Sequence, residues 1–176
     1  WAPPRDLYLN RADGHVSASL GRDEFGVSGD GVIVGVIDTG ADVTHPALRN
    51  ADGSTRIAWL LDFDSPPLGV HAAIEEELGC TVDTPCAVYS ADDLDALLEA
   101  TAAPNLPSDQ VGHGTHVLTT AAGRDDEYPG IAPDARLVVV RAGGDSGSLG
   151  DGEILLGARF VFDRATEMKL PAVINV

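Results

Sequence analysis

Two residues have types and surroundings that suit proton-transfer chemistry. Asp38 directly follows the apolar run VIVGVI at 32–37, at the carboxyl end of a predicted strand, where open α/β sheets hold their functional groups. His113 lies between two glycines at the start of a predicted helix that ends near Gly123, so we expect its ring to face a cleft. A helix amino end disfavours a permanent imidazolium. His113 therefore suits a group that accepts a proton and later donates it.

Simpler interpretations of the same residues stay open. Asp38 could only cap a turn. His113 and His116 are three residues apart and share a helix face, so they could be structural or could bind a metal ion. A zinc site needs about three protein ligands, and no third ligand stands at a recognisable spacing. We therefore predict no metal site.

The elements that would position these residues alternate between strands and helices. The run at 32–37 is almost continuously β-branched, which is typical of a strand buried on both faces of a parallel sheet. Further strands are predicted at 136–141 and from 172, and Asp151 is expected to cap a helix that runs to about Lys169 before Pro171. A short helix is expected at 17–24. Strand, helix and strand in this order indicate an α/β fold.

Length and charge exclude several classes of protein. The 176 residues with 44% hydrophobic content suffice for one globular domain, with residues 1–30 as an N-terminal arm. The formal net charge is −17, so nucleic acid is not an expected partner. No apolar run is long enough for a membrane span, and the first residues lack a signal-peptide core. We expect a processed or excised chain.

The region at about 57–109 is predicted to be an acidic insertion. Between Arg56 and Arg124 the sequence has eleven Asp or Glu and no Lys or Arg. The run SADD at 90–93 resembles a capping box and predicts a short helix. Cys80 and Cys86 fit a small disulfide loop of a secreted or extracytoplasmic protein, or else two free thiols.

Five stretches, taken together, resemble consecutive landmarks of the subtilisin family of serine proteases. They are GVIVGVIDTG at 31–40, HPAL at 45–48, HGTHV at 113–117, GIAPDARL at 130–137 and VIN at 173–175. The resemblance implies a three-layer α/β fold with a central, mostly parallel sheet. It also implies that Asp38 holds the imidazole of His113 in the correct tautomer, that His113 is the general base, and that His116 is a buried structural residue.

The resemblance further implies binding partners, and it implies that the C-terminal half of the catalytic domain lies outside this sequence. The family's Gly-Thr-Ser motif is absent and the last serine is Ser148, so we expect residues 31–176 to be the N-terminal part of a catalytic domain that stops in a strand and is inactive alone. The expected partners are a peptide or protein substrate, the C-terminal half and an inhibitory propeptide. Gly147, Ser148 and Leu149 fall where the family offers a strand edge to substrate, although an ordinary loop is the alternative.

Three departures from the family concern cofactors and the active-site surroundings. No cofactor is expected for the chemistry, and a structural calcium ion is compatible with the family, but Ala47 replaces the acidic ligand common in H-P-x-L. The 75 residues from Asp38 to His113 are more than usual and would place the acidic region beside the site. Residues 118–120 (LTT) replace the usual Ala-Gly-Thr, which would alter the packing of the helix.

Two other functions compete with a serine endopeptidase. The run DTGA at 38–41 also matches the motif of retroviral-type aspartic proteases, which are all-β and need no histidine. A non-catalytic pseudoprotease, whose acidic region recruits a basic partner, is the second alternative, because the nucleophilic serine lies outside this sequence.

Overall fold

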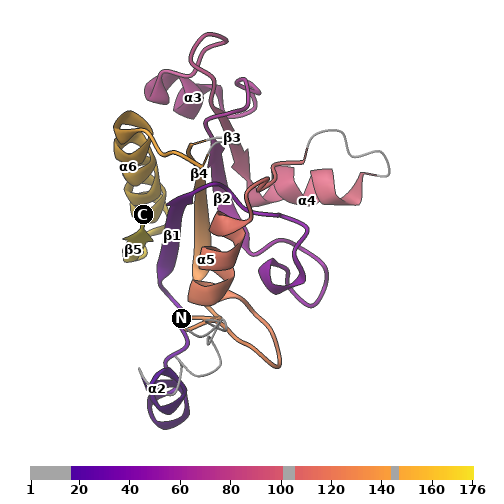
Figure 1. The fold of residues 1–176 in the computed structure, drawn as a ribbon, viewed down its shortest axis with the longest axis vertical. Coiled ribbons are helices and arrows are strands. Elements are labelled where there is room, and N and C mark those ends of the chain that lie inside the picture. The colour runs from indigo at the N-terminus through magenta and orange to yellow at the C-terminus, as the bar shows by residue number, and fades with distance from the viewer. Residues whose placement is uncertain (1–16, 101–105, 144–146) are drawn as a thin grey trace, which may run out of the picture.

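The computed structural model describes residues 17–100, 106–143 and 147–176, and it forms an α/β fold around one five-stranded sheet (Figure 1). The strand order is β3-β2-β4-β1-β5, and every neighbouring pair is parallel except β2 with β3. The strands are β1 (Ile33–Asp38), β2 (Ile57–Asp62), β3 (Ala87–Ser90), β4 (Arg136–Arg141) and β5 (Ala172–Asn175). The helices are α2 (Ala18–Phe25), α3 (Ala72–Leu78), α4 (Ala91–Glu99), α5 (His113–Ala122) and α6 (Asp151–Met168), with a 3-10 turn, η1 (Pro46–Leu48).

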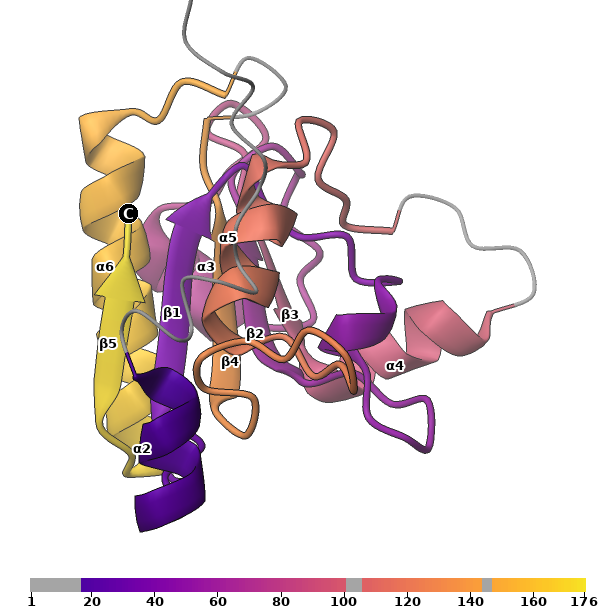
Figure 2. The ribbon, with the colours of Figure 1, turned by 60° about the horizontal axis from the view of Figure 1, so that its bottom comes forward.

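Helices cover both faces of the sheet, which gives the expected three layers. In β1, Val34 and Val36 belong to one buried cluster, whereas Ile33 and Ile37 belong to the other. The first cluster includes residues of α4 and α5, and the second includes residues of α3 and α6. Figure 2 shows α5 and α6 on opposite sides of β1. The strands are therefore apolar on both faces because both faces are buried.

Most of the predicted elements are present with nearly the predicted bounds. The predicted strand at 136–141 is β4, and the predicted strands at 32–37 and from 172 are β1 and β5. The short helix expected at 17–24 is α2. The capping box before α4 is confirmed, because Ser90 and Asp93 exchange backbone and side-chain hydrogen bonds. The helix expected from Asp151 begins there, but its N-cap is Gly150 rather than Asp151.

The expectation that an insertion begins at residue 57 is wrong, because residues 57–62 are strand β2. This strand pairs in parallel with β4 in the interior of the sheet. Strand β3 then pairs with β2 as the antiparallel edge, so the acidic region extends the main sheet. The patterns considered above predict neither of these strands nor α3.

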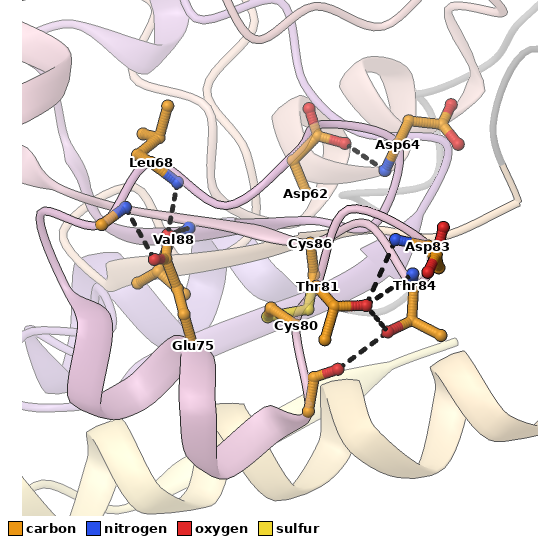
Figure 3. The surroundings of a disulfide bond; sticks show 12 residues. Asp62, Asp64, Leu68, Glu75, Cys80, Thr81, Asp83, Thr84, Cys86 and Val88 are labelled. Carbon is orange, nitrogen blue, oxygen red and sulfur yellow. Dashed lines mark hydrogen bonds between the residues drawn. A yellow bond between two sulfur atoms is a disulfide. The ribbon is translucent and has the colours of Figure 1, made fainter.

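Several acidic side chains of this region bind backbone amides (Figure 3). Glu75 is 3% exposed, and its carboxylate accepts hydrogen bonds from the amides of Leu68, Gly69 and Val88 at 2.9, 2.8 and 3.3 Å. A buried carboxylate with three such donors is satisfied without a basic partner. Other carboxylates of the region pair with arginines that lie outside it, since Asp62 and Asp64 contact Arg141 and Glu77 contacts Arg159.

Cys80 and Cys86 form a disulfide, so the alternative of two free thiols is wrong. The bond joins the residue after the C-cap of α3 to the residue before β3, and Figure 3 shows it beside the turn of Thr81 and Thr84. A cross-link over six residues of separation stabilises the fold by about 2 kcal/mol in the loop-entropy account. The disulfide therefore fixes α3 to the edge strand.

One buried arginine joins three segments around the carboxyl end of α5. The guanidinium of Arg56 donates to the carbonyl oxygens of Ala47, Ala122, Pro133 and Ala135 at 2.9, 2.7, 2.6 and 3.3 Å. Burial lowers the pKa of Arg56 to about 10, which still leaves it charged at neutral pH. A cation at a helix carboxyl end also interacts favourably with the helix dipole.

In the parts of the chain described here, no helix is both long and apolar enough to cross a membrane.

Replacing Arg56 with Met should destabilise the chain by roughly 3 kcal/mol, because four carbonyl oxygens lose a buried donor. Met fills a similar volume, so the effect is not due to a cavity. The matched control is Arg49→Met, since among the described residues the Arg49 guanidinium donates to Gly53 in its own turn, and the change in stability should be less than about 0.5 kcal/mol. Urea denaturation followed by far-ultraviolet circular dichroism measures both. Equal midpoints for the two variants would contradict the role given to Arg56.

Candidate active site

The structure brings Asp38 and His113 together at the carboxyl end of β1. Nδ1 of His113 lies 2.8 Å from Oδ1 and 2.9 Å from Oδ2 of Asp38. The Asp38 side chain is 7% exposed and that of His113 is 65% exposed. Because an ionised carboxylate only accepts hydrogen bonds, Nδ1 carries the hydrogen, and in the neutral ring Nε2 has a free lone pair. The imidazole is therefore oriented on its buried side and open to a proton donor on its other side.

Asp38 is fixed by backbone contacts of its own strand end. Its carbonyl oxygen accepts a hydrogen bond from the amide of Ala142 at 2.7 Å, just beyond the parallel partner β4. Its Oδ1 also accepts from the amide of Thr39 at 2.7 Å. The carboxylate thus has a donor on the turn behind it as well as the histidine in front of it, which restricts its rotation.

The first turn of α5 lies directly on the turn that follows β1. A Cβ atom added at Gly114 would overlap the carbonyl oxygen of Gly40 and would lie 3.2 Å from Cβ of Asp38. The amide of Gly114 donates to Oγ1 of Thr39 at 2.9 Å. Only glycine allows this approach, and the approach brings His113 within hydrogen-bond distance of Asp38.

Asp38 favours the charged form of the His113 ring. The hydrogen bond with Asp38 and the charge of Asp38 raise the pKa of His113, with a smaller contribution from Asp109. The opposing influence expected of the helix amino end stays a prediction. A general base must be neutral before it accepts a proton, so the fraction of His113 in that form grows as the pH rises through this elevated pKa.

Asp109 is a residue of the site that the patterns above do not predict. Its carboxylate accepts hydrogen bonds from side chains and amides on both sides of His113, including Thr39 Oγ1 at 2.8 Å and the Thr115 amide at 2.8 Å. The available signal was its position four residues before His113, close to a helix start that Gly112 cannot cap with a side chain.

The expected burial of His116 is wrong for this chain, because His116 is exposed. It lies one turn beyond His113 on α5, whose buried residues are Gly114, Leu118 and Ala122. His116 therefore shares the exposed side of α5 with His113, and the three buried residues form the side that packs on the sheet. Within the described residues no group of three or more His, Cys, Asp or Glu side chains is arranged to hold a metal ion.

Gly147 lies beside the site, but residues 147–150 are not a strand. A Cβ atom at Gly147 would be 3.9 Å from methyl carbons of Thr39 and Val111. Gly147 has φ 69°, so its backbone is left-handed and not extended, while Ser148 is exposed and Leu149 is partly buried. Substrate binding by these three residues stays a prediction.

The competing interpretation of the DTG run as an aspartic-protease motif is wrong. That class is all-β, whereas this chain has a mostly parallel sheet covered by helices. Within the described residues, Asp38 is also hydrogen-bonded to His113.

Replacing Asp38 with Asn should lower the pKa of His113 toward its ordinary value of about 6.5, because the charge and the carboxylate acceptor that stabilise the imidazolium are removed. Proton NMR of the ring Hε1 signal across a pH series measures this directly. The control is Asp52→Asn, an exposed aspartate whose side chain accepts hydrogen bonds from Ser54. A titration of His113 that is the same in both variants would contradict the pairing.

Gly114→Ala should destabilise the chain by about 2 kcal/mol or more, since its methyl group meets rigid backbone at Gly40. Gly152→Ala is the matched control, because Gly152 also lies in the first turn of a helix and an added Cβ would meet nothing within 4 Å. The control should gain up to about 1 kcal/mol from helix propensity. Thermal unfolding compares the two, and an unaffected Gly114→Ala variant would mean that α5 is not held by this contact.

Two curated relatives are similar to most of this chain. The subtilisin of Bacillus sp. (strain TA39) is 30% identical over 151 residues, which are 84% of this chain and 27% of the relative. The major intracellular serine protease of Bacillus subtilis (strain 168) is 31% identical over 126 residues, 70% of this chain and 28% of the relative. The chain thus spans little more than a quarter of the length of each.

Solved structures share the fold, and a family match agrees with them. The CspB protease of Clostridium perfringens superposes with a TM-score of 0.71 and 23% identity, covering 90% of this chain and 31% of that one. Sphericase gives a TM-score of 0.50 and 26% identity, covering 84% of this chain and 37% of that one. Residues 29–172 match the family described as the Subtilase family. Because this match covers well over half of the sequence, the chain belongs to the subtilase family.

Proposed function

We propose that this chain supplies the aspartate and the histidine of a serine endopeptidase whose nucleophilic serine lies in another part of the same protein. The observation that carries the proposal is the pair itself, a buried Asp38 within 2.8 Å of Nδ1 on an exposed His113. Family membership supports the reaction class. The chain covers only about a quarter of the relatives, which leaves room for the serine outside it.

The geometry suits each step of acyl transfer. Nε2 of His113 would take the proton of the serine hydroxyl as its oxygen attacks the peptide carbonyl. The hydrogen bond to Asp38 would stabilise the imidazolium that forms. The same ring then gives the proton to the leaving amine, and a water molecule repeats the sequence to release the acyl group. The whole cycle uses side chains, so we propose that the chemistry needs no cofactor.

The surroundings of the H-P-x-L turn support a proposal about calcium. Ala47 offers no carboxylate, and its carbonyl oxygen accepts hydrogen bonds from Arg56 at 2.9 Å and from the Arg124 amide at 2.8 Å. A carbonyl oxygen that already accepts two N–H donors is a poor calcium ligand, because both of its lone pairs are used. We propose that no calcium ion binds at this turn.

The disulfide supports a proposal about location. Disulfides form and persist mainly in oxidising compartments, and Cys80 is bonded to Cys86. We propose on this ground that the protein acts outside the cytoplasm. Family membership does not favour either side, since one relative is named as an intracellular protease. A peptide or protein is the proposed substrate, and the remaining part of the catalytic domain and an inhibitory propeptide are the proposed partners.

The test uses the parent protein and compares Asp38→Asn and His113→Ala with the Asp52→Asn control. Peptide hydrolysis and labelling by a fluorophosphonate are the two readouts. Each site variant should lower kcat by about four orders of magnitude or more, because loss of a triad member removes most of the acceleration. The control should keep the activity of the unmodified protein.

Other results of this experiment would contradict the proposal. An active and labelled His113→Ala variant would remove the proposed general base. A parent protein that folds but neither turns over peptide nor takes the label would favour the non-catalytic alternative. Turnover by the purified 176-residue chain alone would show that the nucleophile is not outside it.

A further inference from the structure

The carboxylate of Asp109 joins two segments that carry the candidate catalytic pair. We propose that Asp109 is a positioning residue that holds the first turn of α5, and with it His113, in the orientation needed to meet Asp38. This inference rests on the proposed function of the pair. Asp109 touches neither member directly in the described structure, and it acts through Thr39 and Thr115.

One carboxylate oxygen binds the turn behind Asp38. Oδ1 of Asp109 accepts a hydrogen bond from Oγ1 of Thr39 at 2.8 Å. The same hydroxyl accepts from the amide of Gly114 at 2.9 Å, so it receives a donor from α5 and gives its hydrogen to Asp109. Oδ1 also accepts from the amides of Val111 and Gly112 at 3.2 and 2.7 Å. The chain just before His113 is therefore fixed to the residue just after Asp38.

The other carboxylate oxygen binds the far side of the same helical turn. Oδ2 accepts from the amide of Thr115 at 2.8 Å and from its hydroxyl at 2.7 Å. The Thr115 hydroxyl in turn accepts from the amide of Asp42 at 2.9 Å. Each carboxylate oxygen of Asp109 is thus connected to the 38–42 turn by a threonine hydroxyl. Oδ1 binds Thr39 of that turn, and Oδ2 binds Thr115, which binds the amide of Asp42. Rotation of the helix about its axis would break one of the two connections.

A carboxylate is the group that these contacts require. The Asp109 side chain is the acceptor in all five of these hydrogen bonds, three to Oδ1 and two to Oδ2. An asparagine has one acceptor oxygen, and its amide group would face an N–H donor on one side or the other. The N-cap residue of α5 is Gly112, which has no side chain to bind the first amides, so Asp109 provides the acceptor and the negative charge at this helix amino end.

The rest of α5 is held by other interactions, so loss of Asp109 should loosen the first turn without unfolding the helix. Leu118 and Ala122 are fully buried against the sheet. The carbonyl of Ala122 is bound by Arg56 at the opposite end of the helix. The effect of Asp109 should therefore be concentrated at His113.

The test compares Asp109→Asn with the matched control Asp125→Asn. Asp125 follows α5, and its carboxylate also accepts hydrogen bonds from amides, those of Glu127 and Tyr128, without contact to the catalytic pair. Both substitutions remove one charge and one acceptor at nearly constant volume. The first readout is the His113 titration of the 176-residue chain by NMR. The second is the separation of kcat and KM in the parent protein.

Asp109→Asn should lower the pKa of His113, because Asp109 is one of the two carboxylates that raise it, the other being Asp38. It should lower kcat by roughly 10- to 100-fold with KM within about twofold, as expected when a reacting group is displaced by a fraction of an ångström to an ångström. Asp125→Asn should change neither readout. Asp109→Glu, which restores the charge, should recover the titration of His113 more fully than its kcat.

An Asp109→Asn variant with a lower melting temperature but an unchanged His113 titration and unchanged kcat would overturn the proposal and leave Asp109 as a helix cap only. That result differs from failure of the proposed function. If His113→Ala keeps full activity, the catalytic assignment itself fails. If His113→Ala is inactive and Asp109→Asn is unaffected, only the positioning role fails.

Discussion

The close contact between the turn after β1 and the first turn of α5 is the constraint on which the candidate site depends. Gly114 lies so near the backbone at Gly40 that no side chain fits between them. This contact brings an exposed histidine from a helix within hydrogen-bond distance of a buried aspartate at a strand end. The parallel sheet supplies the fixed side of the contact, because β1 lies between β4 and β5 and cannot shift without breaking both ladders.

Carboxylates have two different roles in this strongly acidic chain. Some take the place of a missing backbone partner, as Glu75 does for three amides and Asp109 does around the helix start. Asp38 instead changes the proton affinity of His113, because its hydrogen bond and its charge raise the pKa of that histidine. A net charge of −17 is therefore not only a property of the solvated surface, since several of these charges are satisfied inside the fold.

Helix α5 is held differently at its two ends, and this suits a helix that carries the candidate general base. A guanidinium binds the carbonyl of Ala122 at the carboxyl end, and a carboxylate binds the amides at the amino end. Each charge has the sign that the helix dipole favours. Hydrophobic packing fixes the helix on the sheet, whereas these two polar contacts fix its position along and about its own axis. Arg56 is 66 positions from Ala122, whereas Asp109 binds amides three and six positions away and also Thr39, 70 positions away.

The sequence by itself determined the α/β class, the bounds of β1 and β4, the capping box before α4 and the candidate pair of Asp38 and His113. Periodicity, local turn residues and motifs in a fixed order are enough for such features, because they depend on neighbours along the chain. Only the tertiary structure decided that 57–62 is an interior strand, that the cysteines are joined, that His116 is exposed and that Asp109 binds both sides of α5. These depend on contacts between residues up to about 80 positions apart, and no local pattern encodes which distant donor a carboxylate will meet.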